Sequence, residues 1–108
     1  MIVQLRSEHP DYPDLSAGQP YCVIGIKADE YRILNDVGRP FLYPPDIFEV
    51  TDSREPWDWV TEFGDDGERY AYPPALNGIG FFEDYFDHKE QQVSIFRHLL
   101  NRRLATAA

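Results

Sequence analysis

Residues 21–52, YCVIGIKADEYRILNDVGRPFLYPPDIFEVTD, decide the fold. Two short apolar runs, 21–27 and 31–34, are separated by a polar turn, and a second turn at 35–38 ends in the glycine that such turns favour. A third run ends at Pro44-Pro45, because proline interrupts the hydrogen bonding of a strand, and a fourth begins at Phe48. Short strands joined by tight turns predict a small, bent antiparallel sheet or a half-open barrel.

The rest of the chain adds one more hairpin and a helix. Residues 57–63 and 68–72 flank Gly64-Asp65-Asp66-Gly67, which has the composition of a hairpin loop. Apolar residues at three- and four-residue spacing predict a helix over 88–104, with Asp87 as its N-cap. The expected fold class is mainly β with a C-terminal helix (α+β).

The 108 residues predict a single domain. Three prolines in the first 20 residues indicate a Pro-rich, extended arm over 1–20 that leads into a sheet over 21–72. The expected core residues are Ile24, Ile26, Ile33, Leu34, Phe48, Val50, Phe96 and Leu100.

Charge is distributed unevenly along the chain. The net charge is −9, and residues 46–90 hold 13 acidic and three basic side chains, whereas residues 91–108 hold three arginines and no acid. A negative field repels the phosphate backbone of nucleic acids and speeds association with a basic protein. We therefore expect no nucleic acid binding and a basic protein partner.

The single cysteine, Cys22, alternates with Ile24 and Ile26, which predicts a buried and inert thiol. Residues 1–6 lack the apolar core of a secretory leader, and no run reaches the roughly 18 apolar residues of a membrane span. These features favour a cytoplasmic protein that does not enter a membrane.

No residues have the pattern of a metal or catalytic centre. The three histidines do not stand at ligand spacing from one another or from the cysteine, so we expect no metal and no cofactor. Acidic residues cluster over 83–90, where a carboxylate pair could act as acid and base if an apolar pocket raised the pKa of one member. The cluster comprises Glu83, Asp84, Asp87 and Glu90.

The second predicted hairpin joins acidic and aromatic residues. Alternation places Trp57, Trp59 and Phe63 on one face, for which packing in the core is the favoured interpretation. An exposed aromatic side chain among acids would instead form a binding hot spot. The expected partner-binding residues are Asp58, Glu62, Asp65, Asp66, Glu68, Tyr70 and Tyr72.

Several segments within residues 20–63 resemble one protein family, and none of them includes a catalytic motif. They look like small bacterial SH3-like β-barrel proteins, some of which act as immunity proteins beside secreted polymorphic toxins. The resemblance implies a cytosolic, non-enzymatic protein that binds one cognate toxin. The segments are Tyr21-Cys-Val-Ile-Gly-Ile, Tyr31-Arg-Ile-Leu-Asn-Asp, Phe41-Leu-Tyr-Pro-Pro, Phe48-Glu-Val-Thr-Asp and Pro56-Trp-Asp-Trp.

The function that we expect is therefore non-enzymatic: an acidic, protein-binding domain that neutralises a basic toxin domain. Acids placed where phosphates would lie suit an inhibitor that occupies a nucleic-acid cleft. The alternative is an interaction or assembly adaptor without a toxin partner. A small hydrolase that uses the acidic residues of 83–90 ranks third.

Overall fold

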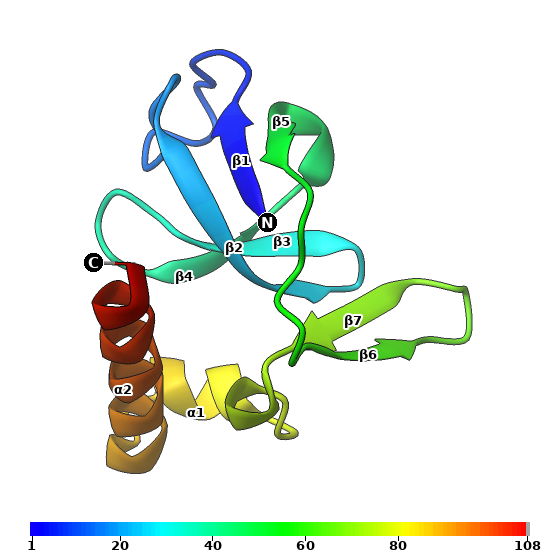
Figure 1. Ribbon diagram of the computed structural model, residues 1–108. Helices are drawn as coiled ribbons and strands as arrows, with labels where there is room; N and C mark the ends of the chain where they lie inside the picture. The colour runs from blue at the N-terminus through cyan, green and yellow to red at the C-terminus, as the bar shows by residue number, and fades with distance from the viewer. Residues whose placement is uncertain (108) are drawn as a thin grey trace.

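Figure 1 shows the computed structural model, which describes residues 1–107 and their side chains as far as residue 103. Within this range seven strands form one antiparallel sheet, and two helices follow it, so the predicted fold class is confirmed. The elements are β1 (Ile2–Leu5), β2 (Pro20–Lys27), β3 (Glu30–Leu34), β4 (Pro40–Tyr43), β5 (Phe48–Asp52), β6 (Val60–Phe63), β7 (Arg69–Tyr72), α1 (Phe81–Phe86) and α2 (Glu90–Ala107), with short 3-10 turns at Pro45–Ile47 and Pro74–Leu76.

The sheet is built around β2. One edge of β2 pairs with β3, and the other edge pairs first with β1 and then, at Ile26, with Ala71 of β7. The order along the main path is β4-β3-β2-β1-β5, and β6 joins the sheet through β7 (Figure 1). The described strands at the two ends of this path, β4 and β5, do not pair with each other, so the sheet is bent but open.

Gly25 allows β2 to pair with both β3 and β7. The register between β2 and β3 shifts between Val23 and Gly25, which is the bulge that a glycine inside a strand indicates. A Cβ atom at this position would lie 2.2 Å from two ring atoms of Tyr72. Glycine is therefore needed at the point where β7 pairs with β2.

The core consists of two apolar clusters. Neighbouring residues of β2, Val23 and Ile24, belong to different clusters because successive side chains of a strand point to opposite faces. The sheet cluster contains Val3, Leu5, Leu15, Tyr21, Val23, Ile26, Ile33, Tyr43, Phe48 and Ala71. The helix cluster contains Ile24, Tyr72, Leu76, Phe81, Phe82 and Phe96.

Most of the predicted core residues are buried. Ile24, Ile26, Ile33, Phe48 and Phe96 are confirmed in the two clusters, and Leu34 and Leu100 are half-buried against the helix cluster. Val50 was expected in the core and is 43% exposed. It lies in β5, which ends the sheet and pairs only with β1 among the described strands, so that less of the molecule covers it.

The predicted Pro-rich arm over 1–20 is corrected at its start. Val3 and Leu5 alternate with a polar residue and are buried, so β1 lies inside the sheet between β2 and β5. The remainder of the arm is held in place by polar contacts. Tyr43 Oη donates to Asp14 Oδ2 at 2.6 Å, and Ser16 Oγ donates to Asp36 Oδ2 at 2.7 Å.

Two further local predictions are wrong. Cys22 is exposed, because the residues on either side of it in β2 point into the sheet cluster and alternation turns the thiol outward. Asp87 does not cap α2. Its backbone N–H donates to Glu83 O at the end of α1, and His88 then adopts a left-handed conformation with φ of 60°. The predicted helix over 88–104 therefore begins at Glu90.

Candidate functional site

The β6–β7 hairpin carries the predicted partner-binding residues. Its loop forms where the sequence predicted it, with Gly64 N donating to Glu68 O at 2.9 Å and Gly67 N donating to Gly64 O at 3.0 Å. The first strand begins at Val60 rather than at residue 57. Figure 1 shows the hairpin projecting to the right, below β5 and joined to it by a long connection.

The hairpin has two different faces. Glu62 and Tyr70 are opposite each other and, with Tyr72, line a cavity that extends to α1. Phe63 and Arg69 are also opposite each other and lie on the other face. There Arg69 donates to Glu55 and, at 3.1 Å, to Thr61 Oγ1.

β6 presents a free edge. All four of its residues are exposed, and among the described strands it pairs only with β7. The hydrogen bond between Gly64 and Glu68 sets the alternation of the ladder, in which every second residue turns its backbone away from the partner strand. The N–H and C=O groups of Thr61 and Phe63 therefore point outward, where another strand could pair with them.

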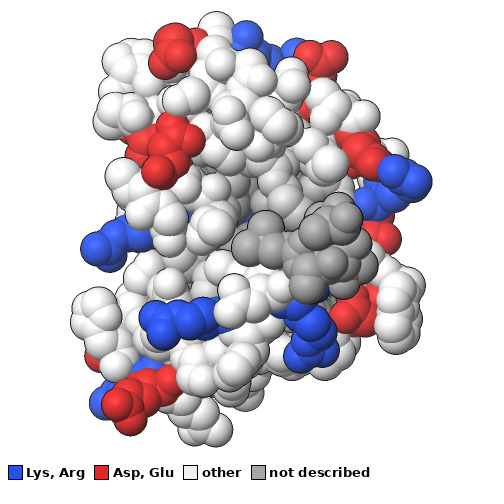
Figure 2. Space-filling model, turned by 60° about the vertical axis from the view of Figure 1, so that its left-hand side comes forward, with Lys and Arg blue, Asp and Glu red and all other residues white. Residues whose placement is uncertain are grey.

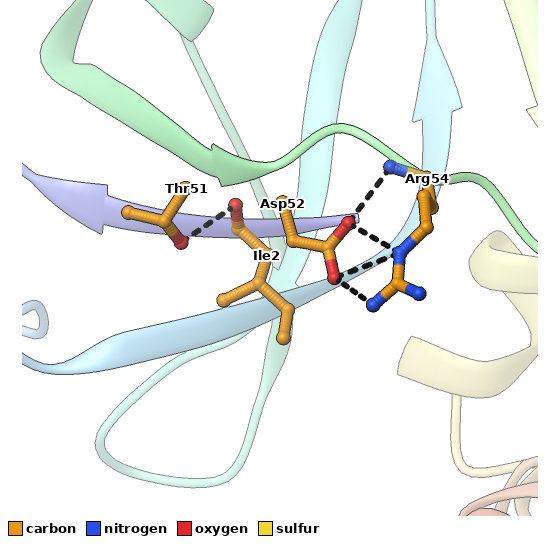
Figure 3. A network of polar contacts seen from close by, with 4 residues as sticks. All are labelled: Ile2, Thr51, Asp52 and Arg54. Carbon is orange, nitrogen blue, oxygen red and sulfur yellow. Dashed lines mark hydrogen bonds and ion pairs between the residues drawn. The ribbon is translucent and has the colours of Figure 1, made fainter.

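Two arginines near the hairpin are already paired. Arg54 makes a bidentate contact with Asp52, with nitrogen–oxygen distances of 2.7 to 3.2 Å, and Figure 3 shows this contact beside the hydrogen bond from Thr51 Oγ1 to Ile2 O. This hydrogen bonding by Arg54 lowers the pKa of Asp52, and hydrogen bonding by Arg69 likewise lowers the pKa of Glu55. Both arginines of this region are thus neutralised by acids outside the hairpin.

The five predicted acidic contact residues form no ion pairs with described residues. Glu62, Asp65 and Asp66 are exposed, while Asp58 and Glu68 are half-buried. By contrast, Figure 2 shows Lys/Arg and Asp/Glu groups interspersed on the face turned toward the viewer. The hairpin is therefore a local concentration of negative charge.

The aromatic side chains of this region divide differently from the prediction. Trp57 is 96% exposed and Phe63 is 69% exposed, so the expectation that both pack in the core is wrong. Trp59 does pack, half-buried, against the sheet cluster. Tyr72 was expected at the partner surface and is buried, with its Oη accepting a hydrogen bond of 2.8 Å from Arg32 Nε. Burial raises the pKa of Tyr72.

The acidic residues of 83–90 do not form a buried pair. Asp84 is half-buried and the other three are exposed, so these carboxylates do not share the apolar pocket that acid–base catalysis by a pair requires. Among the described residues no group of three potential metal ligands is found. No described helix is long and apolar enough to span a membrane.

Two adjoining cavities lie between the sheet and α1. Their volumes are about 640 and 320 Å³, and they share Lys27, Arg32, Phe82 and Glu83 in their walls. Arg32 was not among the predicted site residues, although a lone charge inside the apolar run Tyr31-Arg-Ile-Leu is a signal of unusual burial. Ile79, an exposed residue of the smaller cavity, was not predicted either.

No protein-family model, curated protein or solved structure matches this chain. The SH3-like resemblance and the immunity function that it implies stay predictions.

Proposed function

We propose that this chain is a protein-binding domain that holds a basic partner on the β6–β7 hairpin. The observation that carries the proposal is the coincidence of three features. β6 is an exposed edge strand, Trp57 and Phe63 are exposed beside it, and the hairpin acids form no ion pairs with described residues. Exposed edges and large exposed apolar side chains are features that a protein without a partner at that place normally avoids.

Each feature has a separate role in binding. The acids speed the encounter with a basic surface, which makes the association rate fall as salt is added. The exposed aromatic side chains become buried and supply most of the affinity, as aromatic anchors do at interfaces. The outward backbone groups of Thr61 and Phe63 pair with an extended segment of the partner, which fixes its register.

The narrower form of the proposal is that the partner is a toxin domain. It is motivated by the SH3-like resemblance and by the acidic hairpin, which suits a cleft that otherwise binds phosphates. An adaptor would bind its partner without blocking an activity. Inhibition of the purified partner's activity by the chain at equal concentration therefore separates the two functions.

The role of charge is tested with a partner captured from the native host. Its association rate is measured with two variants of equal net charge. Asp65→Lys with Asp66→Lys reverses the hairpin loop, and Asp46→Lys with Glu49→Lys reverses two exposed acids at β5. The loop variant should lower the association rate of the captured partner at least several-fold at low salt, and the control should not. Equal association rates for both variants would place the interface elsewhere.

The strand-pairing argument is tested at Thr61. Thr61→Pro removes an outward N–H, which an edge strand tolerates, whereas Thr61→Val removes only the hydroxyl and keeps the N–H. The proline variant should dissociate at least about tenfold faster, in line with the loss of a backbone hydrogen bond and of the fit around it. Equal dissociation rates for the two variants would mean that β6 does not pair with the partner.

A further inference from the structure

Arg32 is a buried cation at the centre of the molecule. Its side chain belongs to β3 and is only 4% exposed. Nε donates to Tyr72 Oη at 2.8 Å and Nη1 donates to Pro40 O at 2.7 Å. The guanidinium carbon lies 3.8 Å from the centre of the Phe82 ring, which is a close cation–π contact. The side chain is thus held rigidly by three neighbours.

This buried charge has no ion-pair partner within the described part of the chain. Glu83 lines the same cavities and, beyond the larger effect of burial, helps to raise the pKa of Tyr72, the hydroxyl partner of Arg32, but it forms no ion pair with the guanidinium. A buried cation without an anion is costly, and proteins normally pair such charges. The arrangement points to an anion that the chain itself does not supply.

One nitrogen of Arg32 is available to such an anion. Nη2 makes no hydrogen bond with a described residue. Among the described residues, Trp59 Nε1 is the only fully buried polar side-chain atom without a partner, so Nη2 is not fully buried. Nη2 therefore reaches the surface, and the surfaces that Arg32 lines are the two cavities beside α1. The free donor faces a hollow large enough for a ligand.

The walls of the larger cavity describe the ligand. A volume of about 640 Å³ lies in the range of small-molecule sites. Phe41, Phe82 and Phe86 provide apolar and aromatic walls, and Lys27 provides a second cation. The wall also includes three carboxylates, which repel any anion but repel a doubly charged phosphate more strongly than a singly charged carboxylate. They belong to Asp11, Asp14 and Glu83.

We propose that this cavity binds a carboxylic acid with an apolar body. The carboxylate accepts a hydrogen bond from Arg32 Nη2 and supplies the missing charge, while an aryl or acyl group lies against the rings of Phe82 and Phe86. The carboxylate belongs either to a free small acid or to the C-terminal residue of a peptide, since both present the same chemistry. No residue of β6 lines this cavity, so the proposed ligand site can be tested independently of the protein partner.

The first test uses the wild-type chain and matched probes. 3-Phenylpropionate is compared by NMR titration with 3-phenylpropanamide, which has the same shape without the charge, and with inorganic phosphate. The acid should bind at least about tenfold more tightly than the amide, as expected for a hydrogen bond to a charged group. It should also shift the Nε–H resonance of Arg32. Tighter binding of N-acetylphenylalanine than of 3-phenylpropionate would assign the site to a peptide C-terminus.

The second test uses Arg32→Met, with Arg39→Met as a matched control. Arg39 lies in the same hairpin, and it is exposed. The Arg32 variant should lose at least about tenfold in affinity for the acid, whereas the Arg39 variant should not. Both variants are compared at a temperature at which they are folded, because removing Arg32 also leaves Tyr72 Oη and Pro40 O without their donor. Equal binding of the acid and its amide, or unchanged binding by the Arg32 variant, would overturn the proposal. A shift confined to residues outside the cavity would also overturn it.

Discussion

The β1–β5 part of the sheet and strand β6 contain the same kinds of residue, yet the first buries most of its apolar side chains and the second displays them. The sheet cluster is drawn from β1 to β5 with Leu15 and with Ala71 of β7, whereas every residue of β6 is exposed. Alternation of side chains shows that a strand has two faces. It does not show which face the rest of the molecule will cover.

The difference lies in the number of neighbours that each strand has. β2 has partner strands at both edges and an apolar cluster on each face. β6 has one partner strand, and the other edge is open. An exposed aromatic residue on such a strand is available for binding, whereas the same residue in β2 would contribute to stability.

The largest effect should come from the sheet cluster. Ile33→Ala removes a side chain that is fully buried in β3 and should lower the free energy of unfolding by about 2–5 kcal/mol. The control is Phe63→Ala in the exposed strand, which removes a larger side chain. Urea unfolding measures both changes. A loss for Phe63→Ala that matches the loss for Ile33→Ala would remove the contrast between the two regions.

The join between the two regions should be the next most sensitive point. Gly25→Ala places a Cβ against the Tyr72 ring and 3.0 Å from Ala71 O, so β7 must move away from β2. Overpacking of this kind costs about 1–3 kcal/mol. Gly64→Ala is the control, because its nearest neighbour is the end of the flexible Glu68 side chain. If the two variants unfold at the same urea concentration, the pairing of β7 with β2 does not depend on Gly25.

The sequence predicted the elements of this fold better than their burial. The turns at 35–38 and 64–67 and the bulge at Gly25 were readable, because local chemistry determines them. Strand β1 was missed, because the prolines after it suggested an irregular arm, and its two buried residues become informative only once β2 and β5 lie beside them.

The candidate site was predictable in its charge but not in its anchors. The hairpin acids follow directly from the sequence. The exposure of Trp57 depends on β6 starting three residues later than expected. The burial of Tyr72 depends on the pairing of β7 with β2, which brings its ring against Gly25. The absence of an ion-pair partner for Arg32 could not be predicted from the sequence, because it depends on where every carboxylate of the chain lies in space.

The polar contacts that hold the arm should have a smaller, pH-dependent effect. Burial, and then the hydrogen bond to Asp14, raises the pKa of Tyr43. The unfolded chain therefore releases this proton first, so the stabilisation is complete below pH of about 10 and declines as the pH rises above it. Tyr43→Phe should cost roughly 0.5–1.5 kcal/mol at neutral pH and should weaken the alkaline loss of stability. Thermal melts between neutral and alkaline pH measure both effects, and an unchanged alkaline slope would contradict this assignment.

The smallest effect on stability should come from the largest exposed side chain. Trp57→Ala should change the free energy of unfolding by no more than about 0.5 kcal/mol, because a surface substitution removes little buried area. Trp59→Ala is a close control two residues away, and it should cost clearly more because Trp59 packs against the sheet cluster. Urea unfolding of the two variants compares an exposed and a half-buried tryptophan in one segment. A large loss for Trp57→Ala would show that this side chain is covered in the folded protein, and Trp57 would then no longer be an anchor for a partner.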